Sequence, residues 1–441
     1  MQKFVDARNC DFERLSLITL ILKSIRFRRI EIMKAILVVG DGMSDRPLKE
    51  LDGKTPLEIA ETPNLDKVAR AGVCGIMDII SPGIPPGSDI ANIALLGYDP
   101  IKSYRGRGAL EAFGANIPVN EGDVAFRGNF AYIEEGIVID RRAGRIDGTI
   151  FKDYLSEVHL PSHPEISVTV MPTLEHRLVV VLRGRGLSWK VSDTDPHKDK
   201  VKVLKSTPLD SSEEAERTAF IVNKLSEELA DLMEKHPVNR ERAGRGLPRA
   251  NGILLRGAGE PPAIKSMREL FSIKGGCVSA TPTVRGVCRY AGFDVYDAPG
   301  GTGSINTDTI SKAKTVEQIL PDYDLVYLHV KGTDNASHDG NPRLKVKIIE
   351  NIDKMIGHLL DHIDLDETYL AVTADHTTSC TAKDHRGDPV PVAICGPEVR
   401  SDSVALFSER SCAAGGLGRI KGMDLMPILL DFLNKTKLIG S

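Results

Sequence analysis

Short runs of branched apolar residues recur along the chain, separated by longer segments with helical periodicity. Residues 35–39, 324–330 and 370–374 are such runs, and each is followed at once by polar residues. Runs of this kind are typical of parallel strands that are buried on both faces. Because open α/β sheets bind ligands at the carboxyl ends of their strands, the polar residues there are candidate site residues. The pattern predicts an α/β fold with a mostly parallel sheet.

The polar residues at these strand ends are aspartate and histidine. The first run ends at Asp41 in a GDG turn, and a further histidine follows the third run by way of a loop that returns to an apolar segment, 390–395. Asp334 and His338 follow the second run four residues apart, so they share one face if this turn is helical. The other residues of the set are Asp375, His376 and His385. Carboxylate and imidazole together suit a divalent metal ion, although Asp375-His376 alone is equally compatible with a turn cap and a hydrogen-bonded histidine.

Ser88 lies at the end of a loop rich in proline and glycine, residues 82–87, just before a helix predicted to begin near Asp89. The amide groups and the dipole of a helix N-terminus favour an alkoxide or a phosphoryl group at this place. A simple N-cap is the alternative. Because the chain has no G-x-S-x-G motif around Ser88, activation of the serine would have to come from a metal ion.

The character of the chain changes near residue 116. Short strands are expected at 124–133, 136–139 and 178–182, with a helix over 211–236, and arginines gather in the loops between them. We predict three parts: a core of residues 33–115 and 281–441, an inserted α+β cap of residues 116–280, and an N-terminal extension of residues 1–32. Arginine binds carboxylate and phosphate with a planar fork, although solvated loop charges would give the same pattern.

Composition and charge exclude several classes of protein. The net charge of -4 and the pI near 6.3 argue against a nucleic-acid binder, because no basic excess is present to displace phosphate counterions. Seven scattered cysteines without a C-x-x-C pair favour reduced thiols in a cytoplasmic protein. The apolar octet 15–22 is too short to span a bilayer. For residues 1–32 an amphipathic helix, a weak membrane-surface anchor and an upstream stretch before a true start at Met33 compete; we favour the last and expect a peripheral or disordered segment.

The motifs GDGMSD, PGSDIANIALLGYDP, KGTDNASHDG, TADHTT and DHRGDPVPV resemble those of the alkaline phosphatase superfamily, in the same order. The tracts RGRGALEAFGA and IDRRAGRI narrow the resemblance to bisphosphoglycerate-independent phosphoglycerate mutases of the archaeal type. The resemblance covers the chain from Met33 to its end. It implies a three-layer, alkaline-phosphatase-like core with an inserted cap, and an isomerase of glycolysis and gluconeogenesis that needs no bisphosphoglycerate.

The resemblance also implies two divalent metal ions. One would be held by Asp334, His338 and His385, and the other by Asp41, Asp375, His376 and the Ser88 oxygen. Nitrogen and oxygen ligands together favour Mn²⁺ or Zn²⁺, and Mg²⁺ or Co²⁺ are the alternatives, although Mg²⁺ prefers oxygen ligands alone.

In this reading Ser88 takes the phosphoryl group from 3-phosphoglycerate and returns it to the other hydroxyl, while Lys331 stabilises a leaving oxygen. Residues expected on the substrate side are Arg105, Arg107, Arg141, Arg142, His176, Arg177 and Arg256. A phosphatase, a phosphopentomutase and a non-catalytic phosphate-binding protein are the rival functions. A small phosphoglycerate is the expected partner, nucleic acid and membrane are not, and a homo-oligomer is compatible with the sequence.

Overall fold

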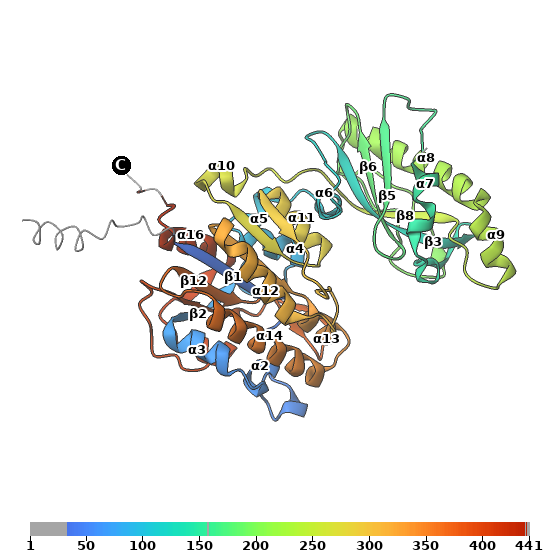
Figure 1. The fold of residues 1–441 in the computed structure, drawn as a ribbon. Helices are drawn as coiled ribbons and strands as arrows, with labels where there is room; N and C mark the ends of the chain where they lie inside the picture. The colour runs from blue at the N-terminus through green and yellow to red at the C-terminus, as the bar shows by residue number, and fades with distance from the viewer. Residues whose placement is uncertain (1–32, 157, 437, 439–441) are drawn as a thin grey trace, which may run out of the picture.

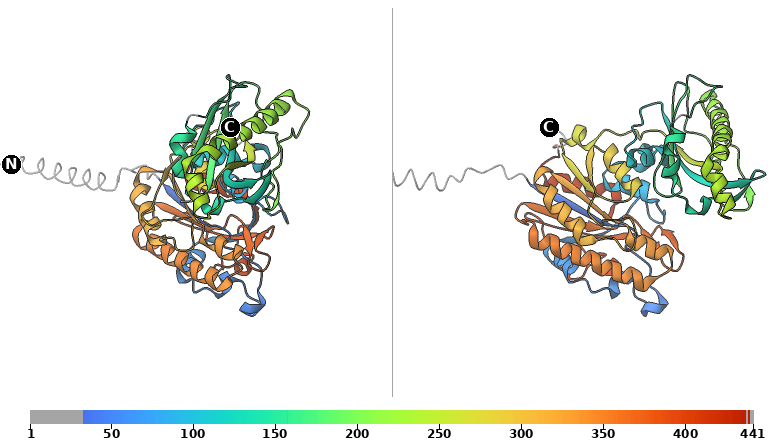
Figure 2. Two further views of the ribbon diagram at one scale, coloured as in Figure 1. Left: turned by 90° about the vertical axis from the view of Figure 1, so that its right-hand side faces the viewer. Right: turned by 45° about the vertical axis from the view of Figure 1, so that its right-hand side comes forward.

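Two lobes, each built around its own β-sheet, make up the computed structural model, which describes residues 33–156, 158–436 and 438 (Figure 1). The predicted extension, residues 1–32, lies outside the described residues. In the right-hand view of Figure 2 the lobes stand side by side, joined through the region of α6. None of the helices in the described part of the chain combines the length and the apolar character needed to cross a membrane.

The core lobe contains an eight-stranded sheet with the order β10-β9-β11-β1-β12-β15-β2-β16. Its strands are β1 (Lys34–Gly40), β2 (Val73–Asp78), β9 (Gly275–Val278), β10 (Phe293–Tyr296), β11 (Leu325–Val330), β12 (Thr368–Thr373), β15 (Val390–Cys395) and β16 (Gly418–Lys421). Within this sheet β15 alone runs against the other strands. Strands β1, β11 and β12 are neighbours and almost wholly buried, as their apolar runs predicted. The expected α/β fold with a mostly parallel sheet is confirmed.

Helices pack against one another in two groups around this sheet. One group consists of α2 (Pro56–Ile59), α3 (Pro63–Ala71), α12 (Thr309–Ile319) and α14 (Pro342–His362), and the other of α4 (Ser88–Leu95), α6 (Arg107–Gly114), α11 (Pro282–Tyr290) and α16 (Gly422–Phe432). Helix α3 begins at Pro63, and the side chain of the preceding Thr62 does not cap it. Asp353 of α14 caps it instead, since its carboxylate accepts hydrogen bonds from the amides of Asn64 and Leu65 at 2.8 Å each. This long-range cap ties α3 to α14.

The second lobe has an antiparallel sheet with the order β5-β6-β3-β4-β7. Strand β8 also pairs with β3, on the edge opposite β6. Its elements are β3 (Val124–Glu134), β4 (Ile137–Asp140), β5 (Ser167–Pro172), β6 (Arg177–Arg183), β7 (Val201–Lys202), α8 (Glu213–Lys235), α9 (Pro237–Gly244) and β8 (Gly252–Gly259). Helix α8 packs on the sheet and encloses an apolar core separate from that of the first lobe. The cap limits 116 and 280 stay a prediction; by sheet membership the chain is already back in the core sheet at Gly275.

Helix α6 connects the lobes. Ala109 and Ala112 pack against Val179 and Val181 of the second lobe, while Leu110 belongs to the core of the first. The helix crosses α11 at close range, because a Cβ on Gly286 would lie only 1.8 Å from the carbonyl oxygen of Leu110. The missing side chain of Gly286 therefore permits the close approach of α11 and α6, which positions α6 between the core and the cap.

Candidate active site

All seven predicted metal ligands lie at the carboxyl ends of β1, β11 and β12 or close to them. Asp41 follows β1, and helix α13 (Gly332–His338) carries Asp334 and His338 directly after β11. After β12 come Asp375 and His376, and then a hairpin of β13 (Thr377–Ser379) and β14 (Asp384–Arg386) that brings in His385. The loop predicted between β12 and β15 thus contains a short hairpin. Ser88 is the first residue of α4.

Asp334, His338 and His385 form the first group. The Nε2 atoms of the two histidines lie 3.3 Å apart, and 3.3 and 3.4 Å from Asp334 Oδ1. Each histidine donates its Nδ1 hydrogen to a backbone carbonyl, of Lys383 at 2.8 Å and of Pro86 at 2.7 Å. In the neutral rings both Nε2 lone pairs are therefore directed at a carboxylate oxygen. Three electron-rich atoms at this separation are stabilised by a positive charge between them; a proton supplies it when the pKa of His338 is raised by Asp334, and the same donor set fits a metal ion.

The second group is centred on His376, which is fully buried. Its Nε2 lies 3.3 Å from Asp41 Oδ1, 3.5 Å from Asp375 Oδ1 and 3.2 Å from Ser88 Oγ. Its Nδ1 contacts the Thr378 hydroxyl, which donates in turn to Asp334 Oδ1 at 2.8 Å. Thr378 thus links the two groups.

Burial shapes the charges of this second group. Burial and the neighbouring charge of Asp41 raise the pKa of Asp375. Burial also opposes ionisation of Asp41, yet the Lys331 ammonium, together with the His329 and His376 rings, lowers the pKa of Asp41. Asp41 Oδ2 is buried 3.0 Å from both Lys331 Nζ and His329 Nε2, and the His329 ring makes no well-formed hydrogen bond to the described residues. A buried imidazole without a well-formed hydrogen bond, beside a carboxylate pair, is a second sign that the site fits a cation.

Lys331 lies between the two groups. Its Nζ is 2.6 Å from Asp334 Oδ2 and 3.0 Å from Asp41 Oδ2. Although burial disfavours the charge, the carboxylates raise the pKa of Lys331, so it remains an ammonium at neutral pH.

The sequence analysis did not include His329, whose Nε2 is 3.0 Å from Asp41 Oδ2. The signal was a histidine inside an otherwise apolar strand, which also fits a satisfied core residue.

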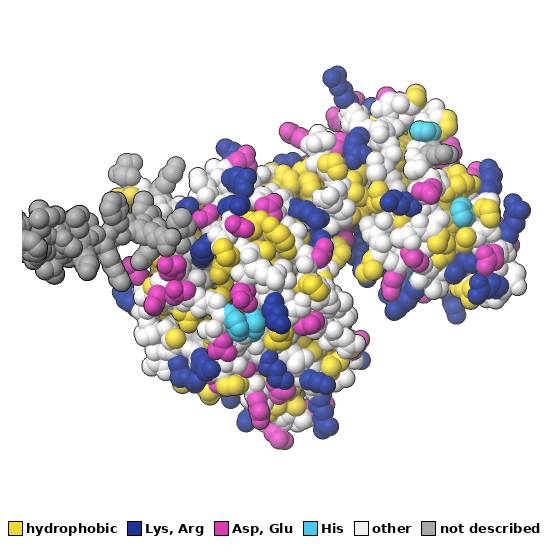
Figure 3. All heavy atoms as spheres, in the orientation of Figure 1, with side chains coloured by type: hydrophobic (Ala, Val, Ile, Leu, Met, Phe, Trp, Pro, Cys, Tyr) yellow, Lys and Arg dark blue, Asp and Glu magenta, His cyan; other side chains and the backbone are white. Residues whose placement is uncertain are grey.

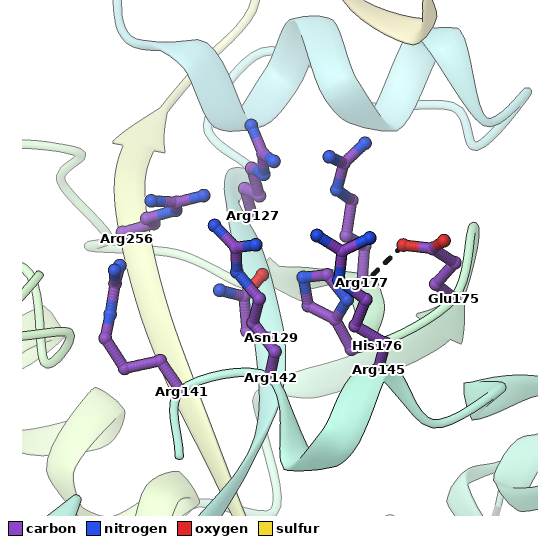
Figure 4. Close-up of a pocket in the computed structure, with 9 residues that line it drawn as sticks. All are labelled: Arg127, Asn129, Arg141, Arg142, Arg145, Glu175, His176, Arg177 and Arg256. Atoms are coloured by element: carbon purple, nitrogen blue, oxygen red, sulfur yellow. Dashed lines mark ion pairs between the residues drawn. The ribbon is translucent and has the colours of Figure 1, made fainter. Parts of the chain in front are cut away.

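A pocket of about 150 Å³ in the cap lobe gathers most of the predicted substrate residues (Figure 4). It is lined by Arg141, Arg142, His176, Arg177 and Arg256, and also by Arg127, Asn129, Arg145 and Glu175, which were not predicted. Neighbouring strands and loops of the cap sheet supply them: β3, the loop after β4, the loop before β6, β6 itself and β8. Strands far apart in sequence therefore build a single arginine pocket.

The pocket has more positive charge than its own carboxylates balance. Asp195 pairs with Arg141 through two bonds of 2.8 and 2.7 Å, and Glu111 of α6 reaches Arg127 at 3.3 Å. Burial and the neighbouring arginines nonetheless lower the pKa of Arg127 to about 9. Burial and adjacent arginines also lower the pKa of His176 to about 4, so its ring is neutral at pH 7. A bound anion would relieve this excess of positive charge.

Two predicted substrate residues lie outside the pocket lining. Arg105 forms an ion pair of 2.6 Å with Glu260, and Arg107 contacts Glu111 at 2.9 Å and Thr283 at 3.0 Å. Both arginines flank the junction between the lobes, where helix α6 begins. Their contacts are those of side chains that hold this junction.

Comparisons with known proteins identify the family to which the chain is similar. A family model described as 2,3-bisphosphoglycerate-independent phosphoglycerate mutase matches residues 69–239. A Thermococcus kodakarensis protein of that name is 45% identical over 409 residues, which cover 92% of this chain and 99% of the relative. The chain belongs to this family. A phosphoglycerate mutase of the same family from Methanocaldococcus jannaschii is likewise 45% identical, over 92% of this chain and 99% of its own length.

Two solved structures are similar over nearly the whole chain. The PH0037 protein from Pyrococcus horikoshii superposes with a TM-score of 0.81 at 39% identity, over 93% of this chain and 99% of that one. A cofactor-independent phosphoglycerate mutase from Thermoplasma acidophilum gives 0.69 at 36% identity, over 91% and 100%. The family, the fold and the isomerase class predicted from the sequence are confirmed for this member of the phosphoglycerate mutase family.

Proposed function

We propose that the protein interconverts 3-phosphoglycerate and 2-phosphoglycerate through a phosphoserine at Ser88, in a site that holds two divalent metal ions. The observation that supports this most directly is that Ser88 Oγ and Asp41 Oδ1 lie 3.2 and 3.3 Å from His376 Nε2, in a group that Thr378 links to the Asp334 group. The glycerate would be held by the arginine pocket of the cap.

The donor sets fit one ion each. Asp334, His338 and His385 would hold the first, and the second would be held by Asp41, Asp375, His376 and the Ser88 oxygen. Mixed imidazole and carboxylate ligands favour Mn²⁺ or Zn²⁺, with Co²⁺ as an alternative, over the all-oxygen preference of Mg²⁺. When bound, the ions would lower the pKa of the Ser88 hydroxyl and neutralise charge on the phosphoryl group.

Ser88 Oγ forms a bond to phosphorus, and the bond between phosphorus and the 3-oxygen of the substrate breaks. The proton that the Ser88 hydroxyl gives up is balanced by the proton that the leaving 3-oxygen takes up, and the Lys331 ammonium beside Asp41 and Asp334 stabilises that oxygen as it departs. The glycerate then turns and its 2-hydroxyl attacks the phosphoserine; the bond between phosphorus and Ser88 Oγ breaks, and the proton of the 2-hydroxyl restores the serine hydroxyl. No water is consumed, so the number of phosphoryl groups on glycerate is unchanged. The amides at the start of α4 favour the negative charge that develops at Ser88.

The serine is held by its surroundings. Asn92 donates to the Ser88 carbonyl at 2.6 Å and to Asp375 Oδ2 at 3.0 Å, and it accepts a hydrogen bond from the Tyr327 hydroxyl. The first turn of α4 is thereby fastened to the metal-binding loop after β12. This contact fixes the nucleophile relative to the proposed ligands, as phosphoryl transfer requires.

The arginine pocket is the feature that would let the protein act as a mutase and not as a phosphatase. Between the two transfers the glycerate must stay bound, because water would otherwise hydrolyse the phosphoserine. Arg127, Arg177 and Arg256 offer paired N-H donors that match a carboxylate. Closure of the cap over the core would keep the glycerate in and water out.

The test is to incubate purified protein with Mn²⁺ and 3-phosphoglycerate, without bisphosphoglycerate, and to follow 2-phosphoglycerate and free phosphate. We expect 2-phosphoglycerate with little free phosphate. Mainly free phosphate would indicate a phosphatase, and no change in either would indicate a binding protein.

The variant Ser88→Ala should lose turnover while it still binds Mn²⁺ in calorimetry, and Ser81→Ala, in the same loop, is the matched control. Mutase turnover by Ser88→Ala would refute the covalent step. A cytoplasmic location stays a prediction.

A further inference from the structure

Two histidines and a glutamate gather on the surface of the core lobe, apart from the site described above. Histidine side chains are visible there over α12 and α14 (Figure 3). His358 and His362 are four residues apart near the end of α14, so they project from one face of the helix on successive turns. Glu317 of α12 faces them, and one ligand atom of each residue lies within 4.8 Å of the others.

The geometry of the three side chains is close to that of a chelating set. Glu317 Oε2 is 3.1 Å from His358 Nε2, and two ligands of one tetrahedral zinc ion are about 3.4 Å apart. The two imidazole rings are stacked with their centroids 4.0 Å apart. Because stacked rings lie side by side, a rotation of the His362 side chain would bring its Nε2 to the ion, and the ligand atoms already lie within 4.8 Å of one another.

The hydrogen bonding of His362 leaves a nitrogen free for a ligand bond. Its Nδ1 lies 2.8 Å from the carbonyl oxygen of His358 and must carry the hydrogen, because a carbonyl only accepts. The lone pair of the neutral ring is then on Nε2. Metal-binding histidines commonly donate their other nitrogen to a backbone carbonyl in this way.

The surrounding charge also favours a cation. His358 and His362 lie in the last turns of a helix of 21 residues, where the negative end of the helix dipole attracts positive charge. The metal centre is at the opposite end of α14, which begins four residues after His338. His358 lies 16 residues beyond Pro342, about 24 Å along the helix at 1.5 Å per residue. The cluster is therefore independent of the active site.

We propose that Glu317, His358 and His362 bind a divalent transition-metal ion that bridges α12 and α14. Two imidazoles and one carboxylate select Zn²⁺, Ni²⁺ or Cu²⁺ over Mg²⁺ and Ca²⁺. The ion stabilises the pair of helices that cover one face of the core sheet, and water completes its coordination. It takes no part in turnover, because no substrate-binding group lies near it among the described residues.

The experiment counts ions bound to the full-length protein. Equilibrium dialysis against low micromolar free Zn²⁺, followed by metal analysis, should show one ion fewer per chain for His358→Gln/His362→Gln than for the unaltered protein. Glu317→Gln should keep that ion only at higher free Zn²⁺. The matched control is His159→Gln/His163→Gln, a surface pair with the same spacing that is not on a helix.

Activity and stability give independent readouts. Mutase activity measured with Mn²⁺ should be equal in the unaltered protein and in the His358→Gln/His362→Gln variant. Added Zn²⁺ should raise the unfolding temperature of the unaltered protein more than that of the variant, because binding to the folded state alone stabilises it. An equal ion count in variant and unaltered protein, or an equal loss of ions in the control pair, would overturn the proposal.

Discussion

Lys345 offers a test of how the active-site loops are held. This lysine of α14 has no solvent exposure, and its ammonium donates to the carbonyls of Ser44 at 2.9 Å and Thr378 at 2.8 Å and to Asp45 Oδ2 at 3.1 Å. Ser44 follows the Asp41 turn, and Thr378 bonds the proposed ligands His376 and Asp334. One buried charge thus joins the loop after β1 to the hairpin after β12.

The variant Lys345→Met keeps most of the aliphatic stem and removes all three hydrogen bonds. It also leaves Asp45 buried, with only the amides of Arg46 and Cys380 as donors. Breaking a buried ion pair by removal of one partner costs about 3–5 kcal/mol. We expect a loss of that size in the free energy of unfolding, together with weaker Mn²⁺ binding because the ligand-bearing loops are no longer joined.

Urea denaturation in the presence of EDTA measures the free energy of unfolding without a contribution from bound metal, and calorimetry measures the affinity for Mn²⁺. Lys312→Met is the matched control, since Lys312 is equally buried but makes a single hydrogen bond, of 2.8 Å, to the carbonyl of His329. Burial lowers the pKa of Lys312 to about 8, so loss of this charge should cost much less. The double variant Lys345→Met/Asp45→Asn should regain part of the loss. Equal losses in Lys345→Met and Lys312→Met would show that packing, and not the hydrogen bonds, accounts for the effect.

Three further predictions concern the metal ions and the cap. Removal of metal by EDTA should abolish mutase activity and lower the unfolding temperature, and Mn²⁺ should restore both; full activity after exhaustive chelation would contradict the metal-dependent mechanism. Arg127→Met should raise KM about tenfold or more, a loss of about 1.4 kcal/mol or more in binding, whereas Arg105→Met outside the pocket should change KM little; equal effects in steady-state kinetics would argue against the pocket. Burial lowers the pKa of His176 to about 4 in the folded state, while the unfolded chain has the ordinary value near 6.5, so its contribution to stability is present above about pH 6.5 and is lost as the pH falls toward 4. The free energy of unfolding of His176→Gln, measured in urea, should therefore depend less on pH in this range. An unchanged pH dependence would contradict the lowered pKa of His176.

The buried strands β1, β11 and β12 and the cap helix α8 were predictable, because an apolar run and a long amphipathic pattern are local signals. The short strands β9 and β16 were missed. Each has only four residues, β9 begins with two glycines and β16 carries charged residues at an edge, so pairing with neighbours and not intrinsic preference makes them strands.

The same division holds for functional residues. The sequence pointed to the proposed ligands Asp41, Asp334 and Asp375, because polar residues that closely follow buried parallel strands lie together at the carboxyl ends of those strands. Arg127 is different, because it sits within β3, where an arginine usually reads as a solvent-facing side chain. Only the pairing of β3 with β6 and β8 brings Arg127 beside Arg177 and Arg256.

The sequence by itself determined the buried strands at the centre of the core sheet, the carboxylates and histidines that follow them, and the family. The tertiary structure decided which arginines share a pocket, the place of His329, and the use of Lys345 as a link between distant loops. The physical reason is that strand ends are placed by local backbone rules. The surroundings of a side chain within an element depend instead on contacts between residues tens to hundreds of positions apart, which no local pattern records.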